Sequence, residues 1–165
     1  RYYAAYNTLL HYCFGFKPLK VCIAPGNPYS HRPHRDSSTH PIVFFVVYDL
    51  DPDKPILLVE IKDDECAPAA VLRRHADEQM RELYEEKLAK CPLPRLWGLS
   101  LLGTSMRVYC GDPTLHTINP PVDSSVIPPC PDRALPPSFL AGEWDLDILS
   151  QEGFEKMKKI IGDIK

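Results

Sequence analysis

The sequence predicts an α/β (α+β) protein in which a central mixed β-sheet is flanked by helices. Five apolar runs have the length and the β-branched or aromatic composition of strands: residues 19–24, 42–50, 56–61, 96–102 and 106–110. Three runs have helical periodicity: residues 1–14, 68–90 and 151–164. Strands that are apolar on both faces need cover on both sides, and the interleaved helices can provide it.

The length and composition bound the class of protein. A chain of 165 residues is sufficient for one domain with a sizeable core. Its formal net charge of −3 excludes a generally basic nucleic-acid coat, so any such contact must come from a local patch. No apolar run reaches the roughly 18 residues of a membrane span, and we expect no membrane partner. Six cysteines without a C-x-x-C pair favour buried thiols over disulfides or zinc, and an intracellular location in the cytoplasm or nucleus.

The N-terminal elements are a helix and a short strand. Residues 1–14 contain neither proline nor glycine, and Gly15 is placed to end the helix. Residues 19–24 follow as a strand that stops at Pro25. Residues 27–41 then form a loop that is rich in potential positive charge. Its basic side chains include His31, Arg32, His34 and Arg35. We expect this loop to contact phosphate, with a metal site or a plain surface connection as alternatives.

Residues 42–50 and 56–61 predict an antiparallel hairpin around the turn residues between them. If its loop is the four residues 51–54, Asp49 faces Ile56 and shares one face of the sheet with Glu60 and Lys62. Two carboxylates then converge with an ammonium group, in the oxygen-rich set that Mg²⁺ or Mn²⁺ prefers. A shift of one residue in the loop would give the acidic role to Asp51. The alternative is a solvated edge strand.

The helix over residues 68–90 carries a glutamine on its apolar stripe. That stripe consists of Leu72, Ala76, Met80, Leu83 and Lys87, and Gln79 lies near its middle. A glutamine facing the core needs hydrogen-bond partners, which the acidic site or the backbone under a loop can supply. We expect Arg73, Arg74 and Arg81 to lie off the stripe, solvated or in contact with a phosphate backbone.

The second half of the chain completes the sheet and ends in a helix. Residues 96–102 and 106–110 form a second hairpin, and the proline-rich residues 111–149 wrap the domain. The acidic residues within 143–147 alternate with apolar ones, which indicates a structural segment. Ser150 can cap the final helix, whose predicted buried stripe is Phe154, Met157, Ile160, Ile161 and Ile164. The whole is one domain, with its core in residues 1–110 and its last helix in residues 150–165.

Asp49, a short spacer and Glu60-Ile61-Lys62 at the end of an apolar strand resemble the signature of the PD-(D/E)XK, or restriction-endonuclease-like, nucleases. The order helix, three strands, helix, strand is similar to the αβββαβ core of that superfamily. The resemblance implies that Asp49 and Glu60, with the Ile61 carbonyl, hold Mg²⁺ or Mn²⁺. It further implies that Lys62 is catalytic and that a metal-bound water hydrolyses a phosphodiester. Gln79 resembles a glutamine found on this helix in several exonuclease branches.

The sequence departs from the pattern of that superfamily at three positions. Tyr48 stands where the motif has proline, and Tyr84 follows Gln79 by five residues instead of four. The first helix lacks the glutamate of many members, so that Asn7 or His11 would have to replace it.

Three functional hypotheses follow. The first is a metal-dependent nuclease, acting on DNA in preference to RNA, either as a monomer or as the homodimer that many nucleases of this fold form. The second is an inactive nuclease-fold protein that binds a protein partner as an interaction module or effector. The third expectation, prompted by Arg1 in place of an initiator methionine, is a domain of a larger protein.

Overall fold

The computed structural model describes residues 2–14, 22–26, 43–49, 53–122 and 135–164. Its helices are α1 (Tyr3–Phe14), α2 (Ala70–Lys87) and α3 (Gln151–Ile164), with short 3₁₀ turns at Asp64–Cys66 and Leu88–Lys90. Its strands are β1 (Cys22–Gly26), β2 (Val43–Tyr48), β3 (Pro55–Lys62), β4 (Leu96–Leu102), β5 (Ser105–Asp112), β6 (Thr117–Asn119) and β7 (Leu146–Asp147).

The strands form one mixed sheet of seven strands. Six of them lie in the order β1-β2-β3-β4-β5-β6, and β7 pairs with β5. The β3–β4 pair is parallel, and the other pairs are antiparallel. A parallel pair needs a crossover connection, which α2 provides. β3 therefore lies in the interior of the sheet, with a partner on each side.

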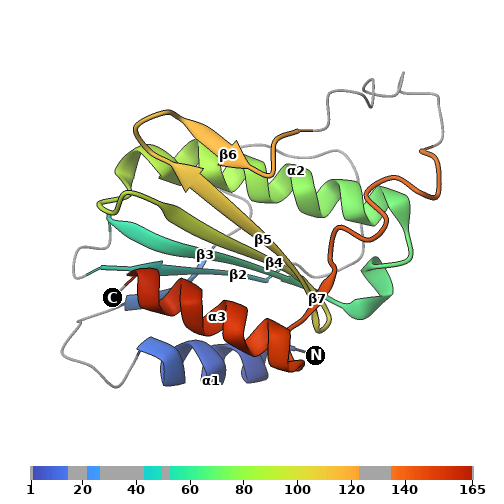
Figure 1. The fold of residues 1–165 in the computed structure, drawn as a ribbon, viewed down its shortest axis with the longest axis horizontal. Coiled ribbons are helices and arrows are strands. Elements are labelled where there is room, and N and C mark those ends of the chain that lie inside the picture. The colour runs from blue at the N-terminus through green and yellow to red at the C-terminus, as the bar shows by residue number, and fades with distance from the viewer. Residues whose placement is uncertain (1, 15–21, 27–42, 50–52, 123–134, 165) are drawn as a thin grey trace.

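The molecule has three layers, with α2 on one face of the sheet and α1 and α3 together on the other (Figure 1). Alternate residues of β3 divide between these layers, since successive side chains in a strand point to opposite faces. Val59 and Ile61 pack in the cluster that contains α1 and α3, while Leu58 packs with Met80 and Tyr84 of α2. Both faces of β3 are thus buried.

The predicted fold class is confirmed. A central mixed sheet is flanked by helices, the elements up to β5 follow the expected order, and α3 is the expected last helix. The predicted cap of α3 is also present, because the amide of Gly153 donates to Ser150 Oγ at 3.0 Å. Phe154, which we expected in the buried stripe, is 55% exposed.

The buried stripe of α2 differs from the predicted one. Arg73 and Tyr84 are buried beside Ala76 and Met80, whereas Leu72 and Leu83 are only half-buried. Polar groups at Arg73 and Tyr84 are satisfied by distant carbonyls, which a count of apolar residues along one helix does not detect. The Tyr84 hydroxyl donates to the Leu96 carbonyl at 2.8 Å.

The region predicted as a wrapping loop contributes to the sheet and to the α2 layer. β6 and β7 both pair with β5. Residues 135–145, which we call the strap, lie between β6 and β7 in the sequence and contact α2 through Arg73. The strap contains Trp144, which is 8% exposed.

No helix in the described ranges is long and apolar enough to cross a bilayer. The cysteines whose state the structure describes are free thiols, at positions 13, 66, 91 and 110.

Candidate active site

Two charged residues lie inside the sheet on the face that α2 covers. Glu60 and Lys62 flank Ile61 on β3 and therefore point to the same side of the sheet. Glu60 is fully buried, and Lys62 is 5% exposed. The alternative of a solvated edge strand is wrong, because β3 is an interior strand. Burying charges is costly unless they are paired, so this pair needs an explanation.

Glu60 receives one strong hydrogen bond and one longer ionic contact. Ser100 Oγ on β4 donates to Glu60 Oε2 at 2.9 Å, and Lys62 Nζ lies 3.5 Å from Oε1. Oε1 receives no hydrogen bond from the described part of the chain. Burial raises the pKa of the Glu60 carboxyl to about 7, although Lys62 and the Ser100 hydroxyl act to lower it. A carboxyl with such a pKa exchanges its proton near neutrality.

Ser100 is itself held by the strap. Trp144 Nε1 donates to Ser100 Oγ at 3.2 Å. Because an indole can only donate, the serine oxygen accepts this bond and directs its own hydrogen to Glu60.

Lys62 is bound by α2. Its Nζ donates to Gln79 Oε1 at 2.5 Å, across 17 residues of sequence. Of the two kinds of partner expected for Gln79, the structure shows the one at the acidic site, through Lys62. Since Gln79 is half-buried, it lies between the enclosed ammonium and the surface.

Asp77 precedes Gln79 by two residues on α2 and is the centre of a second polar cluster. Its Oδ1 accepts hydrogen bonds from Arg107 Nη1 at 3.0 Å and from the Tyr109 hydroxyl at 2.8 Å. Its Oδ2 accepts one from Arg81 Nε at 2.8 Å. Both carboxylate oxygens of Asp77 are therefore occupied. Asp77 also contributes to the raised pKa of Glu60, which identifies the two carboxyl groups as electrostatic neighbours.

Sequence reasoning missed Ser100, Arg107, Asp77 and Trp144. Two of these residues lie in one row with Glu60 across three neighbouring strands. Glu60 on β3 is opposite Ser100 on β4, and Ser100 is opposite Arg107 on β5. The available signal was a polar residue inside each of two apolar strand runs. Their assembly around Glu60 depends on the strand registers, which the sequence pattern did not predict.

The structure corrects the predicted position of Asp49. Tyr48 pairs with Pro55 after a register shift, and the Asp49 amide donates to the Lys54 carbonyl at 2.9 Å. Asp49 is therefore opposite Lys54, not Ile56. Glu60 is opposite Phe44, and the six residues from Lys54 to Glu60 span about 20 Å of strand. The predicted pairing of Asp49 with Glu60 as metal ligands is wrong, because the two residues lie at opposite ends of the hairpin.

The remaining predicted residues divide into three groups. His31, Arg32, His34, Arg35 and the rival acid Asp51 lie outside the described residues. Asn7 and His11 belong to α1, which covers the opposite face of the sheet and cannot supply the missing glutamate. Ile61 turns its side chain to that face too, and it is in register with strands on both sides, so its carbonyl lies within the sheet.

The predicted phosphate contact of Arg73 is wrong, and that of Arg74 stays a prediction. Arg73 is 5% exposed, and its guanidinium donates to the carbonyls of Ala67, Pro137 and Phe139. Each of its three nitrogens thus donates to a backbone carbonyl, and the nearly complete burial of the side chain keeps it from a phosphate at the surface. Arg74 is partly exposed and pairs with Glu78 at 2.6 Å.

Among the carboxylates considered for a divalent cation, one has an oxygen without a hydrogen-bond donor in the part of the chain that the structure describes. The described residues contain no group of three or more histidine, cysteine, aspartate or glutamate side chains that could hold a metal ion. Glu60 Oε1 is a hard oxygen ligand that no donor from the described ranges occupies. Mg²⁺ keeps several waters and is often held by one or two carboxylates together with substrate phosphates. Glu60 is fully buried and Lys62 Nζ lies 3.5 Å from its Oε1, whereas both oxygens of Asp77 accept hydrogen bonds and Asp49 is distant.

Comparison with known proteins reveals no relative: no family model, no curated protein and no solved structure matches this chain.

Proposed function

We propose that this chain hydrolyses phosphodiester bonds of nucleic acid, DNA in preference to RNA, at a site formed by Glu60, Lys62 and Gln79. The observation that carries this proposal is the contact of Lys62 with Gln79. It joins the end of β3 to α2 beside a carboxylate whose Oε1 receives no hydrogen bond from the described residues. The expected αβββαβ order of elements supports the likeness to PD-(D/E)XK nucleases.

Each residue has a chemical part in this proposal. Glu60 would hold Mg²⁺ or Mn²⁺ through Oε1, and the ion would supply a Lewis acid and an activated water. Lys62 provides a fixed positive charge that offsets the negative charge that develops on the phosphate. Gln79 orients the Lys62 ammonium, and Ser100 orients the Glu60 carboxylate. The charges of Glu60 and Lys62 act most strongly in an enclosed site, where little solvent screens them.

The test is a cleavage assay on plasmid DNA and labelled oligonucleotides with Mg²⁺ or Mn²⁺. We expect Lys62→Met to lower the rate by at least about 100-fold, since removing one group that stabilises the transition state has this effect. Glu60→Gln keeps the shape of the side chain and should also remove activity. Glu85→Gln, the same change at an exposed position of α2, is the matched control and should cut like the parent. Cleavage by Lys62→Met at the parent rate would contradict the proposal.

A second candidate function is an inactive nuclease-fold module that binds a protein partner, as a monomer or a homodimer. The distance of about 20 Å along the strand between Asp49 and Glu60 favours it, because Asp49 is then too far away to share a metal ion with Glu60. This function predicts no cleavage with either metal and the same behaviour for the parent and Glu60→Gln.

We also propose the cytoplasm or nucleus as its compartment, on the basis of the free thiols. Retention of free thiols in protein purified from its own cells, measured by alkylation and mass, tests this.

A further inference from the structure

We propose that Arg107 is a binding subsite for a phosphate of the nucleic acid, and that the Glu143 carboxylate occupies its guanidinium when no nucleic acid is bound. The inference rests on the proposed function, because it assigns a substrate contact beside the Glu60–Lys62 pair.

Arg107 is held in a fixed orientation. Its guanidinium carbon lies 5.0 Å from the centre of the Tyr109 ring and 5.3 Å from that of Trp144. Nη1 donates to Asp77 Oδ1 at 3.0 Å. Since the side chain is only 5% exposed, its conformation is fixed before any ligand arrives.

The guanidinium of Arg107 has spare capacity to donate. Its buried Nε has no hydrogen-bond partner among the residues that the structure describes. A buried donor without a partner is costly, and Nε with Nη2 presents two donors in the fork geometry that matches two phosphate oxygens.

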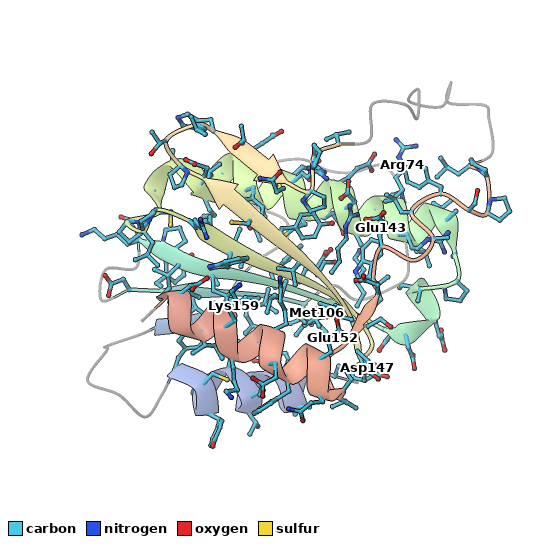
Figure 2. The ribbon with its side chains drawn as sticks, viewed as in Figure 1. Arg74, Met106, Glu143, Asp147, Glu152 and Lys159 are labelled. Carbon is cyan, nitrogen blue, oxygen red and sulfur yellow. The ribbon has the colours of Figure 1, made fainter. Side chains whose placement is uncertain are left out.

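Glu143 is the partner of Arg107 that a phosphate would replace. Its Oε2 lies 3.2 Å from Arg107 Nη2, and its side chain is 47% exposed. Figure 2 shows Glu143 on the same side of the sheet as Arg74 of α2, away from Glu152 and Lys159 of α3. Because the Glu143 carboxylate is half-exposed, water can solvate it when it leaves Arg107, so a phosphate can replace it.

The polar cluster around Asp77 and Arg107 has no net charge when Glu143 is counted in it. Arg81 and Arg107 supply two positive charges, and Asp77 and Glu143 supply two negative ones. When Glu143 moves away, the remaining three residues carry a net charge of +1, which one phosphodiester neutralises.

The position of Arg107 suits a phosphate near the reacting one. Glu60, Ser100 and Arg107 lie on three consecutive strands in register, so the backbones of Glu60 and Arg107 are about 10 Å apart. The two groups are therefore close enough to contact neighbouring phosphates of one strand.

The experiment measures the affinity of a fluorescein-labelled oligonucleotide by anisotropy, over a series of salt concentrations, with EDTA to prevent cleavage. We expect Glu143→Gln to tighten binding several-fold, because it removes the competing carboxylate. Arg107→Gln should weaken binding and lower the slope of log affinity against log salt by about 1. Glu155→Gln removes an exposed carboxylate from α3 and is the control for net charge alone.

The outcomes separate this inference from the proposed function. If Glu143→Gln and Glu155→Gln change the affinity equally, the Arg107 subsite is wrong, whether or not the parent cuts DNA. If Glu143→Gln alone tightens binding but the parent cuts nothing, the subsite stands and the cleavage proposal falls. If the parent binds no nucleic acid, both fall. Glu143 is half-exposed, so this variant tests the subsite even if Arg107→Gln does not fold.

Discussion

Glu60 shows that burial alone can raise the pKa of a carboxyl group, even beside a lysine. A carboxyl group with no exposed surface loses the hydration that stabilises its charge, and its pKa rises to about 7 in spite of a lysine and a serine hydroxyl. The sequence could identify Glu60 and Lys62 as polar residues at the end of an apolar run. It could not show that Ser100 and Trp144 enclose them, since these contacts span 40 and 44 residues.

The buried carboxyl predicts a dependence of stability on pH. The pKa of Glu60 is raised from 4.5 to about 7 by folding, so the folded chain binds this proton more tightly than the unfolded chain. The contribution of Glu60 to the free energy of unfolding is therefore complete below pH 4.5 and is lost as the pH rises to about 7. The loss is on the order of 3 kcal/mol.

Urea unfolding between pH 5 and 8 measures this effect. Glu60→Gln cannot ionise, so its stability should fall less over this range than that of the parent. Glu85→Gln serves again as the control for an exposed glutamate. Equal slopes for the parent and Glu60→Gln would show that the pKa of Glu60 is not raised.

At the scale of elements, the sequence could predict which segments are helices and strands, but not the register in which the strands pair. The helices and the two hairpins follow from apolar periodicity and from turn residues, and the structure contains them with small differences at their ends. The error over Asp49 arose at the tip of the first hairpin, where a register shift places Tyr48 opposite Pro55. A change of this kind alters every facing pair beyond it, yet it leaves the apolar pattern of each strand unchanged.

The packing of α2 against β4 depends on a glycine. A Cβ at Gly98 would lie 2.7 Å from the Tyr84 hydroxyl oxygen and 2.8 Å from a ring carbon, which is closer than such contacts allow. We expect Gly98→Ala to lower the free energy of unfolding by about 1–3 kcal/mol through overpacking. Gly162→Ala meets no atom within 4 Å in α3 and should raise it by about 0.5–1 kcal/mol. Chemical denaturation of both variants checks the contrast, and a neutral Gly98→Ala would contradict the close packing.

At the scale of the whole molecule, the strap connects the C-terminal part of the chain to helix α2. Arg73 of α2 donates to the carbonyls of Pro137 and Phe139, so a single side chain connects the helix to this segment. Helical periodicity could not predict this role, because it assigned Arg73 to the solvated face. These hydrogen bonds join residues about 65 positions apart in the sequence. A local sequence pattern cannot predict such tertiary contacts.

Loss of this connection should loosen the strap. Arg73→Met leaves three backbone carbonyls without their charged donor, and we expect it to cost about 3 kcal/mol or more of unfolding free energy. Limited proteolysis should then cut within residues 135–145 faster than in the parent. Arg74→Met, at the partly exposed neighbouring position, should change neither measurement by much. A strap that resists protease equally in both variants would contradict the role of Arg73.

The hydrogen bond between Trp144 and Ser100 has a consequence for folding kinetics. It closes a loop of 44 residues, and closing long loops delays the contacts that depend on them. The indole reaches its buried position only when β4 and the strap have come together. Its fluorescence would therefore report the moment at which the surroundings of Glu60 become complete, and a Trp97→Phe chain, which keeps one of the two tryptophans, would show that step alone.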